Sequence, residues 1–513
     1  MFKAARFSLI SLAVLLVCCG GGGGSAGDRT GGNVVTQPPV QLRGVPIGGA
    51  TLVPAAIGGG AMASTIDPAV MKKLVDASVT LGSSMTGTPT CAITTYTLKY
   101  HTVDSVAGDT DASTAIIVPS GSNAACQGAR PVMLYAHGTS PRKTTDMSNL
   151  SGTEALLVAA MFATQGYIVV APNYAGYAGS SMAYHAYLDA DQQSNDMVDA
   201  LRAARSVFGS ISATPSSRLM VSGYSQGGFV ALATQRAMQL KYSSEFTVTA
   251  AAPMSGPYAL LQFGDGIYGG APTMGSSGFL PMLINAGQRA GAAIYNSLDD
   301  IYEAKYATGI DTLLPGTQGL GDLVAAGKLP NDVLFAQDSL PQAPGYASFF
   351  GADHLMKTSY RNGYLADLKA NPCNASLGAP LACSPAQPLR KWLLRNDLRT
   401  YIPTVPLFLC GGNEDPVVPF ANTDSTSDYF SARGMPTSLL TVLDVDDSAL
   451  LVPYRATRAE FATAKQVLRL SVLASTGLQA AADKAVNDAY HAGLVAPFCL
   501  REARNFFDSA PSR

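Results

Sequence analysis

The stretch that decides the fold is Leu219-Met220-Val221-Ser222-Gly223-Tyr224-Ser225-Gln226-Gly227-Gly228. In it an apolar, β-type run enters a G-x-S-x-G pentapeptide, and the helix-compatible segment Phe229 to Leu240 follows. A sharp turn from strand to helix at such a pentapeptide lifts the serine hydroxyl clear of the sheet, and the glycines leave room for the strained backbone. The same pattern at residues 23–27 lies in a low-complexity tract that lacks this context. We therefore predict that Ser225 is a nucleophile.

Short β-branched runs alternate with helical patterns on both sides of this stretch. Candidate strands cover residues 93–100, 115–118, 131–136, 167–171, 218–222, 247–251, 405–409 and 439–445. Candidate helices cover residues 153–165, 191–208 and 228–240. Because alternating strands and helices form parallel sheets that are covered on both faces, we predict an α/β fold with a mostly parallel central sheet, whose first two strands are antiparallel.

The alternation stops after Ala251-Ala252-Pro253 and resumes at Val405. The interval 257–403 holds short helical patches between many Gly and Pro breaks. We interpret it as a helical cap that is inserted into a sheet domain formed by residues 65–256 and 404–513; a second independent domain is the alternative. The most apolar patch of the interval consists of Phe279, Leu280, Met282, Leu283 and Ile284.

The N-terminal segment has the layout of a secretory signal. Lys3 and Arg6 precede an apolar run from Phe7 to Val17, which is too short to span a bilayer as a helix. The run ends at two cysteines followed by glycines, which is typical of a bacterial lipoprotein, with Cys19 as the expected lipidated residue and residues 1–19 as the signal. Residues 20–64 are rich in Gly and Pro and predict a flexible tether. We expect an exported protein, either an outer-membrane lipoprotein or one secreted without a lipid.

Six cysteines follow the signal, and an even number in an exported protein favours disulfides. The simplest arrangement pairs neighbours along the chain, although fifteen connectivities are formally open. No C-x-x-C pair or Cys/His cluster supports zinc. The expected pairs are Cys91 with Cys126, Cys373 with Cys383, and Cys410 with Cys499.

Charge and hydropathy limit the partners. The formal net charge is −2, and no block of basic residues is present, so we expect no nucleic-acid partner. No later segment is apolar and long enough to span a membrane, which leaves a lipid anchor as the expected attachment. We expect neither a cofactor nor a metal.

A serine nucleophile needs a base within hydrogen-bond reach and an acid that orients the base. In folds with this strand-turn-helix nucleophile, the three residues follow in the order serine, acid, histidine. Only His354 and His491 follow Ser225 in the chain. Because His354 lies inside the expected cap, before the last strands, we predict that His491 is the base.

The acid should lie in a turn just after a late strand. The candidate strand 405–409 leads into Gly411-Gly412-Asn413-Glu414-Asp415, which places Asp415 at the carboxyl edge of the sheet. We predict Asp415 as the acid. Glu414 is the first alternative, and Asp444 or Asp446 after the next strand is the second.

Two backbone amides must face the charge that develops on the substrate oxygen. One should belong to Gln226, directly after the nucleophile. The other should come from the turn after an earlier strand, from either Gly138 or Thr139, and we prefer Thr139. His137 in the same turn is expected to shape the turn and not to act as a base.

A further turn, Ala171 to Tyr177, ends the next strand and is expected to border the pocket. His185 is a second candidate there, although aromatic packing is the favoured role for this histidine and for the turn. The residues expected to contact the substrate are His137, Gly138, Tyr174, Tyr177 and Tyr224.

Taken together, these segments resemble the α/β-hydrolase superfamily. The resemblance rests on Tyr135-Ala-His-Gly-Thr139, Ala171-Pro-Asn-Tyr-Ala-Gly-Tyr177, Gly223-Tyr-Ser-Gln-Gly227, the Asp415 turn and the His491 segment. Within the superfamily they are most similar to the secretory lipase group (lipase-A type) and its bacterial extracellular esterase relatives. The resemblance implies hydrolysis of carboxylic esters through an acyl-enzyme, under a helical cap.

The resemblance covers residues 88–256 and 400–508, and two features depart from the group. Gln226 stands where the lipase group usually has glycine, and a helical segment of about 45 residues separates the last strand from His491.

The sequence thus predicts a serine esterase or lipase that acts on a small-molecule, lipid or polymer ester. A capped serine aminopeptidase or prolyl-type peptidase is the second hypothesis. A catalytically inactive surface-binding protein on the same fold is the third.

Overall fold

The computed structural model describes residues 42–57, 61–79, 82–449 and 453–511. The expected signal, Cys19 and the first part of the expected tether lie outside these residues. Within the described part, no helix has the length and apolar character that a membrane crossing requires.

The centre of the fold is a ten-stranded sheet in the order β1-β5-β6-β8-β7-β9-β10-β11-β12, with β4 paired to β5. The six strands from β8 to β12 in this order are all parallel, while β5 and β6 form an antiparallel start and β6 also runs antiparallel to β8. All eight expected strands are present, and the predicted mostly parallel sheet is confirmed. The strands are β1 Thr51–Leu52, β4 Thr65–Ile66, β5 Ala92–Val103, β6 Asp109–Ser120, β7 Arg130–Ala136, β8 Ile168–Pro172, β9 Pro215–Tyr224, β10 Ala250–Met254, β11 Leu407–Gly411 and β12 Leu440–Asp444; β2 Ala55–Ala56 and β3 Met62–Ala63 form a separate pair.

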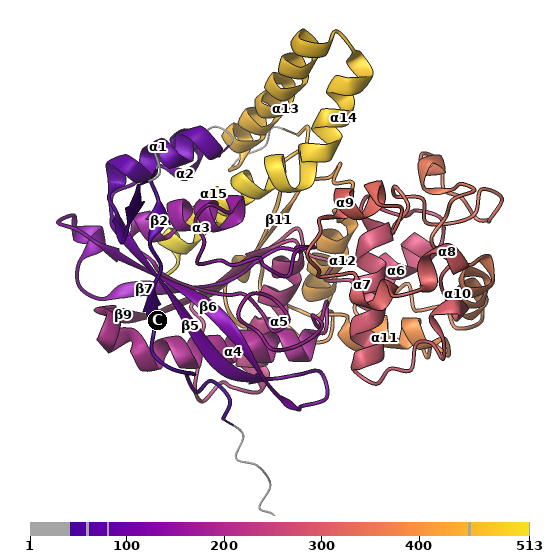
Figure 1. Ribbon diagram of the computed structural model, residues 1–513, viewed down its shortest axis with the longest axis horizontal. Coiled ribbons are helices and arrows are strands. Elements are labelled where there is room, and N and C mark those ends of the chain that lie inside the picture. The colour runs from indigo at the N-terminus through magenta and orange to yellow at the C-terminus, as the bar shows by residue number, and fades with distance from the viewer. Residues whose placement is uncertain (1–41, 58–60, 80–81, 450–452, 512–513) are drawn as a thin grey trace, which may run out of the picture. The chain divides into compact units, whose positions relative to one another are not determined.

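Helices cover both faces of the sheet, as the alternating pattern predicts (Figure 1). Leu134 of β7 packs into the same core cluster as Met197 of the helix α4. Its neighbours Met133 and Tyr135 belong to a second cluster on the opposite face, together with Phe498 of the helix α15. Successive strand residues therefore bury their side chains on alternate faces, which fixes the register of the sheet. One face carries α4 Ala190–Val207 and α5 Gln226–Leu240; the other carries α1 Pro68–Ser78, α2 Gly82–Thr86, α3 Thr153–Met161 and α15 Ala496–Ser509.

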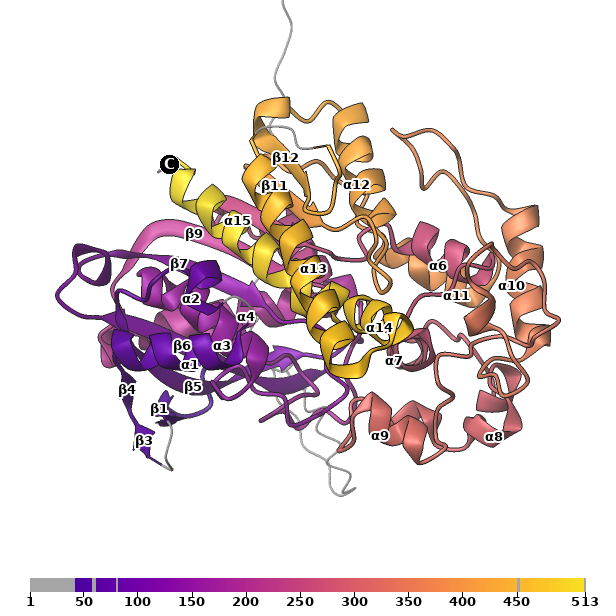
Figure 2. The ribbon, with the colours of Figure 1, turned by 90° about the horizontal axis from the view of Figure 1, so that it is seen from above.

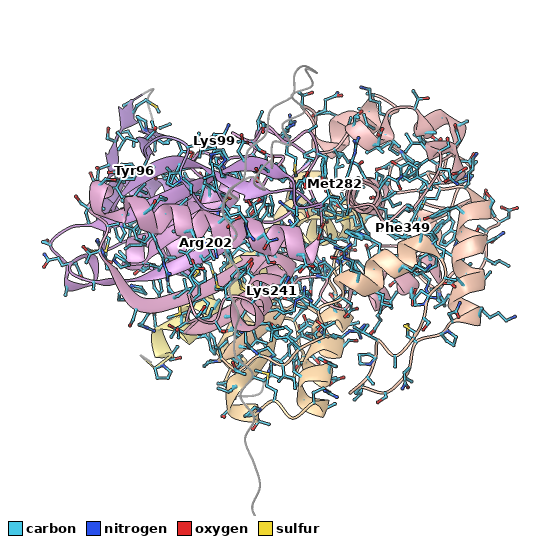
Figure 3. The ribbon with its side chains drawn as sticks, turned by 90° about the horizontal axis from the view of Figure 1, so that it is seen from below. Tyr96, Lys99, Arg202, Lys241, Met282 and Phe349 are labelled. Atoms are coloured by element: carbon cyan, nitrogen blue, oxygen red, sulfur yellow. A yellow bond between two sulfur atoms is a disulfide. The ribbon has the colours of Figure 1, made fainter. Side chains whose placement is uncertain are left out.

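The segment between β10 and β11 is helical and contributes no strand to the main sheet, and every residue of it is described. Its helices lie beyond one end of the strands (Figure 1), and Figure 3 shows Met282 and Phe349 of this segment to the right of Arg202 and Lys241 of the sheet domain. This arrangement agrees with the expected cap. The helices are α6 Leu260–Tyr268, α7 Ser276–Arg289, α8 Ala304–Ala307, α9 Leu320–Ala325, α10 Thr358–Ala370 and α11 Pro388–Asn396.

A helical hairpin follows the last strand and leads directly to His491. After α12 (Ala421–Ala432) and β12, the helices α13 Arg455–Thr476 and α14 Gln479–Ala489 pack against each other and project away from the sheet (Figures 1 and 2). A single turn of π-helix, Tyr490–Val495, then joins α14 to α15. The long segment noted in the sequence is therefore an added hairpin, and its end is the helix that carries His491.

The structure contains three disulfides, in the sequential pairing that the sequence favours. Their Cα–Cα distances are 5.5, 4.5 and 5.6 Å, within the range of ordinary disulfides. The third bond joins the end of β11 to α15. The pairs are Cys91–Cys126, Cys373–Cys383 and Cys410–Cys499.

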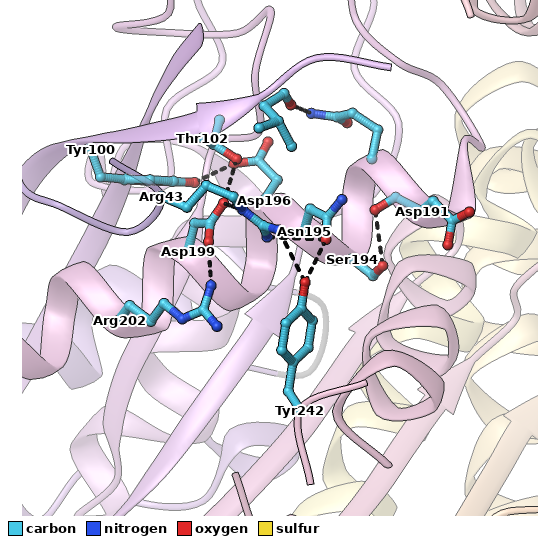
Figure 4. Close-up of polar contacts among 12 residues, drawn as sticks. Arg43, Tyr100, Thr102, Asp191, Ser194, Asn195, Asp196, Asp199, Arg202 and Tyr242 are labelled. Carbon is cyan, nitrogen blue, oxygen red and sulfur yellow. Dashed lines mark hydrogen bonds and ion pairs between the residues drawn. The ribbon is translucent and has the colours of Figure 1, made fainter. Parts of the chain in front are cut away.

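The structure differs from the expected tether from Leu42 onward, because this part of the chain is docked on the sheet domain. β1 and β4 pair with β5. The Arg43 guanidinium donates to Asp199 at 2.9 Å, to Asn195 at 3.0 Å and to Tyr242 at 3.0 Å (Figure 4). Since this buried ion pair has no local sequence pattern, composition alone places the end of the tether too late.

Asp196, on the same helix, is fully buried and links β5 to a loop near the site (Figure 4). Its carboxylate accepts hydrogen bonds from the Tyr100 hydroxyl at 2.6 Å and from the backbone N–H of Ala175. Burial raises the pKa of Asp196 to about 7.

Candidate active site

Ser225 occupies the turn between β9 and α5, with backbone angles φ 60° and ψ −124°. A positive φ is uncommon for a residue with a Cβ and is held only where the surroundings enforce it. The Ser225 N–H donates to the carbonyl of Met254 at the end of β10, at 3.0 Å. The strained turn thus presents the serine side chain beyond the carboxyl edge of the sheet.

The glycines of the pentapeptide allow the helix to begin directly against the sheet. A Cβ on Gly223 would lie 2.2 Å from the carbonyl oxygen of Gly227. A Cβ on Gly227 would lie 2.0 Å from the carbonyl oxygen of Ala136 in β7. Both distances are far below any tolerable contact, so only glycine fits at either position.

Asp415 and His491 form a buried pair. Oδ2 of Asp415 lies 2.6 Å from Nδ1 of His491, and its Oδ1 accepts the N–H groups of Val417 and Val418 at 2.9 and 3.0 Å. Because the carboxylate accepts the proton on Nδ1, Nε2 is left with its lone pair. Nε2 is buried and has no hydrogen-bond partner. This is the arrangement that a general base requires before it takes a proton.

The other candidate acids lie elsewhere. The Glu414 side chain is 69% exposed and pairs with Lys465 at 3.2 Å. Asp444 accepts the N–H groups of Asn413 and Asp446. Asp446 accepts from the Tyr490 hydroxyl and pairs with Lys465. Of the four carboxylates considered, Asp415 is the one that the structure joins to His491 by a hydrogen bond.

Tyr224 connects the nucleophile turn to the helix of the base. Its hydroxyl donates to the backbone carbonyl of His491, and the two rings lie 5.1 Å apart. Burial raises the pKa of the Tyr224 hydroxyl well above its usual range, so it stays protonated and can donate. The predicted contact of Tyr224 with substrate is therefore replaced by a contact with the π-helical turn.

The turn after β7 contains Gly138 and Thr139 and is called the oxyanion turn below. Its hydrogen bonds distinguish between these two candidates for the second amide donor. The N–H of Gly138 is already used, because it donates to both carboxylate oxygens of Glu154 at 3.0 and 3.2 Å. Thr139 borders the same pocket as Ser225 and Gln226. Among the described residues, the backbone N–H groups of Thr139 and Gln226 have no acceptor. This geometry favours Thr139 over Gly138.

The side-chain amide of Gln226 is hydrogen-bonded to His185. Its amide nitrogen lies 2.6 Å from Nε2 of His185, while Nδ1 of that histidine lies 3.1 Å from the Ala175 carbonyl. Nδ1 therefore carries the ring proton and donates to this carbonyl, while Nε2 accepts a hydrogen bond from the Gln226 side-chain N–H. Burial lowers the pKa of His185 to about 3, so this contact persists in neutral form at any ordinary pH. The residue that replaces glycine here is thus fixed by a specific partner.

The remaining predicted contact residues lie behind the site. His137 is buried, and its ring stacks on Tyr174 with centroids 4.2 Å apart and meets the edge of Tyr177 at 5.3 Å. Both tyrosine hydroxyls donate to backbone carbonyls, of His137 and Ser140 respectively. The pocket that contains Ser225 is lined by none of the five residues predicted to contact substrate. The expected packing roles of His137 and the tyrosine turn agree with these contacts.

The pocket that contains Ser225 is mainly apolar. Its empty space, the open mouth included, amounts to about 640 Å³, which is in the usual range for small-molecule sites. Its polar lining includes Thr139, Ser225 and Gln226, and the Thr139 hydroxyl is 3.1 Å from that of Tyr187. The apolar wall comes largely from the cap and the acid turn: Leu260, Phe263, Ile267, Tyr268, Phe279, Leu280, Leu283, Leu393, Val417 and Val418.

Two features of the site were missed by the sequence reasoning. One is Glu154, which has no motif of its own and is marked only by its place in the first turn of α3. The other is the contact between Tyr224 and the His491 helix. Within the described residues, no group of three or more His, Cys, Asp or Glu side chains has the arrangement of a metal site.

Comparison with known proteins identifies the architecture. The sequence model of the prolyl oligopeptidase family matches residues 155–252. No curated protein matches the chain. The ligand-bound rice cell wall degrading esterase LipA from Xanthomonas oryzae has a TM-score of 0.66 and 23% identity, over 91% of this chain and 100% of that one. The protein has the α/β-hydrolase fold.

Two further solved structures are similar to this chain. A Legionella pneumophila protein that is named as a hydrolase has a TM-score of 0.61 and 19% identity, over 89% of this chain and 97% of that one. Candida antarctica lipase A has a TM-score of 0.47 and 13% identity, over 78% of this chain and 76% of that one. The match to LipA spans the cap as well as the sheet domain, because it covers 91% of the chain.

Proposed function

We propose that the protein is a serine hydrolase of carboxylic esters that works through an acyl-enzyme. The observation that carries the proposal is the buried Asp415–His491 pair, which has an unpaired Nε2 and which the Tyr224 hydroxyl links to the strained strand-to-helix turn of Ser225. A side-chain hydroxyl is a weak nucleophile unless a base removes its proton. Nε2 of His491 is the base that this site supplies.

In the first half of the reaction, His491 takes the proton of Ser225 as the serine oxygen attacks the ester carbonyl. Nε2 is unpaired in this structure, and such catalytic hydrogen bonds often tighten only when substrate is bound. The N–H groups of Thr139 and Gln226 stabilise the negative oxygen of the tetrahedral intermediate, and Asp415 stabilises the imidazolium. His491 then gives the proton to the departing alcohol, which leaves an acyl group on Ser225.

In the second half, water replaces the alcohol. His491 removes a proton from the water as its oxygen attacks the acyl carbonyl, and the same amides stabilise the second intermediate. The bond to the serine oxygen breaks, His491 returns the proton to Ser225, and the carboxylic acid leaves. The water supplies both the hydroxyl group and the proton, so no other co-reactant is needed.

An acyl group of mainly apolar character suits the pocket. The cap residues Phe279, Leu280 and Leu283, which belong to the apolar patch noted in the sequence, line it next to Ser225. The LipA protein of the same fold is named as a cell wall degrading esterase, which supports an ester as the substrate class.

A peptidase of the prolyl oligopeptidase type is the second candidate, because that family model matches part of the chain. The matched segment, residues 155–252, runs from α3 to β10 and contains the serine turn but neither Asp415 nor His491. Ester and amide substrates with the same acyl group, assayed side by side, separate the two activities.

The test of the proposed function is a panel of nitrophenyl esters from acetate to palmitate, with aryl and feruloyl esters added. Ser225→Ala should lower kcat by a factor of about 10⁴ or more, since it removes the nucleophile. Ser210→Ala, at an exposed serine after α4, is the matched control. Turnover that survives in Ser225→Ala, with the control unchanged, would remove the basis of the mechanism.

We also propose that the protein is exported and anchored by a lipid on Cys19. The three disulfides support export, because such bonds persist in oxidising compartments. Metabolic labelling with palmitate in a bacterial host tests the anchor, and an equally labelled Cys19→Ser variant would exclude this residue.

A further inference from the structure

Glu154 lies directly behind the oxyanion turn, and no step of the proposed mechanism uses it. It occupies the first turn of α3, where the helix dipole favours a carboxylate. Its Oε1 accepts the Tyr135 hydroxyl at 2.9 Å and the Gly138 N–H at 3.0 Å, and its Oε2 lies 3.2 Å from the same N–H. The carboxylate thus holds the His137–Gly138 peptide. The next peptide along the chain carries the Thr139 N–H.

The side chain of the nucleophile lies close to the same glycine. A Cβ placed on Gly138 would be 3.5 Å from Oε2 of Glu154 and 3.7 Å from Cβ of Ser225. One glycine therefore separates a second carboxylate from the reacting serine.

The titratable groups that face Glu154 come from several elements. Burial, the largest effect, raises the pKa of Glu154 above its ordinary value, while the electrostatic influence of His137 and His491 and the hydrogen bonds from Gly138 and Tyr135 oppose this rise. The phenols of Tyr135, Tyr174 and Tyr224 also face it. The pKa values of these phenols are raised well above their usual range, so the phenols remain neutral. The group of the proposed catalytic residues that interacts electrostatically with Glu154 is therefore His491.

We propose that Glu154 is a positioning residue with two effects: it fixes the Gly138 peptide so that the Thr139 N–H faces the oxyanion, and its charge stabilises protonated His491. This inference rests on the proposed function. The first effect follows from geometry, because consecutive peptide planes share one Cα and a fixed Gly138 restricts the next amide. The second follows from the attraction between a carboxylate and the imidazolium that forms when Ser225 loses its proton.

Two substitutions separate these effects. Glu154→Gln keeps an oxygen that can accept the Gly138 and Tyr135 hydrogen bonds but removes the charge. Glu154→Ala removes both the charge and the acceptor. Thr153→Ala, at the exposed preceding position of α3, is the control for changes to the helix. Thermal unfolding of each variant shows whether the fold is kept.

With nitrophenyl esters, we expect kcat to fall about tenfold in Glu154→Gln and about a hundredfold in Glu154→Ala, with KM nearly unchanged, since loss of one oxyanion donor typically costs a hundredfold or more. The acid limb of kcat/KM against pH should move to lower pH in Glu154→Gln. The reason is that His491 loses a negative neighbour and its pKa falls, so it stays unprotonated to lower pH. A residue that only supported the helix would change stability and leave this limb in place.

A measurement without turnover keeps this inference separate from the proposed function. An NMR titration of the His491 ring should show a lower pKa in Glu154→Gln than in the unaltered protein. If that pKa is unchanged, or if kcat and the acid limb of Glu154→Gln match those of Thr153→Ala, the role of Glu154 is refuted. If Ser225→Ala retains turnover while the His491 pKa shifts as expected, the proposed function fails and the electrostatic role of Glu154 stands.

Discussion

Removal of the Cys410–Cys499 disulfide should damage both the stability and the catalytic site. Cys410 lies in β11, five residues before Asp415, and Cys499 lies eight residues after His491. Both cysteines are fully buried. The bond therefore closes a covalent ring around the acid and the base.

The magnitude follows from the size of the closed loop. The bond spans 89 residues, and the chain-entropy model gives about 4.6 kcal/mol at 25 °C for a loop of this length. The Cys373–Cys383 bond in the cap spans 10 residues, for which the same model gives about 2.7 kcal/mol. We expect the free energy of unfolding to fall by up to these amounts in the Cys410→Ala/Cys499→Ala and Cys373→Ala/Cys383→Ala double variants.

The two double variants should differ more in kcat than in stability. Without the bond, the segments that carry Asp415 and His491 lose a shared anchor, and a misplacement of about 1 Å can cost a factor of about 100 in rate. We expect kcat to fall about tenfold to a hundredfold in the Cys410→Ala/Cys499→Ala variant, and to stay within twofold in the cap variant.

Urea unfolding measures the change in stability, and ester kinetics without urea and well below the unfolding temperature measure the change in kcat. An unchanged kcat in the Cys410→Ala/Cys499→Ala variant would refute the positioning argument even if the stability falls. An equal loss of kcat in both double variants would show that general destabilisation, and not the location of the bond, is responsible.

Three further outcomes follow from single positions. Gly227→Ala places a Cβ 2.0 Å from a backbone oxygen and should cost more than about 3 kcal/mol, whereas Gly209→Ala meets nothing within 4 Å and should stay within about 0.5 kcal/mol; thermal unfolding compares them. Burial raises the pKa of Asp196 to about 7, against about 3.9 when unfolded, so this group lowers stability as pH rises from 4 to 7. Asp196→Asn should remove that slope in urea unfolding, and an unchanged slope would contradict the assignment. Leu283→Trp should fill the pocket and reduce kcat/KM for decanoate at least tenfold more than for acetate, while an equal loss would show that acyl chains bind elsewhere.

The fold could be predicted because its signals are local and repeated. The buried parallel strands are mostly short apolar runs, and most of them alternate with helices along the chain. The serine turn was equally readable, since Gly223 and Gly227 are required by contacts with backbone that any sequence would present. The expected strands differ from the observed ones mainly at their ends, as for β10, expected at 247–251 and found at Ala250–Met254.

The parts that could not be predicted depend on contacts between distant residues. Arg43 reaches Asp199 across 156 positions, and Tyr224 reaches the His491 carbonyl across 267. A tyrosine next to a nucleophile looks like a substrate contact when only its neighbours in the chain are known. The direction of its side chain is set by the π-helical turn, and that turn has no sequence pattern that marks it.

The strained backbone at Ser225 explains why so many of these distant links converge on the site. A serine at φ 60° persists only if its surroundings hold the turn more strongly than the strain opposes it. Here Met254 accepts the serine N–H, and Tyr224 ties the turn to the base-bearing helix. The same helix is tied to the acid by the Asp415–His491 hydrogen bond. A variant that loosens any one link should therefore reduce kcat before it measurably unfolds the protein, because the turn relaxes locally while the sheet below it stays intact.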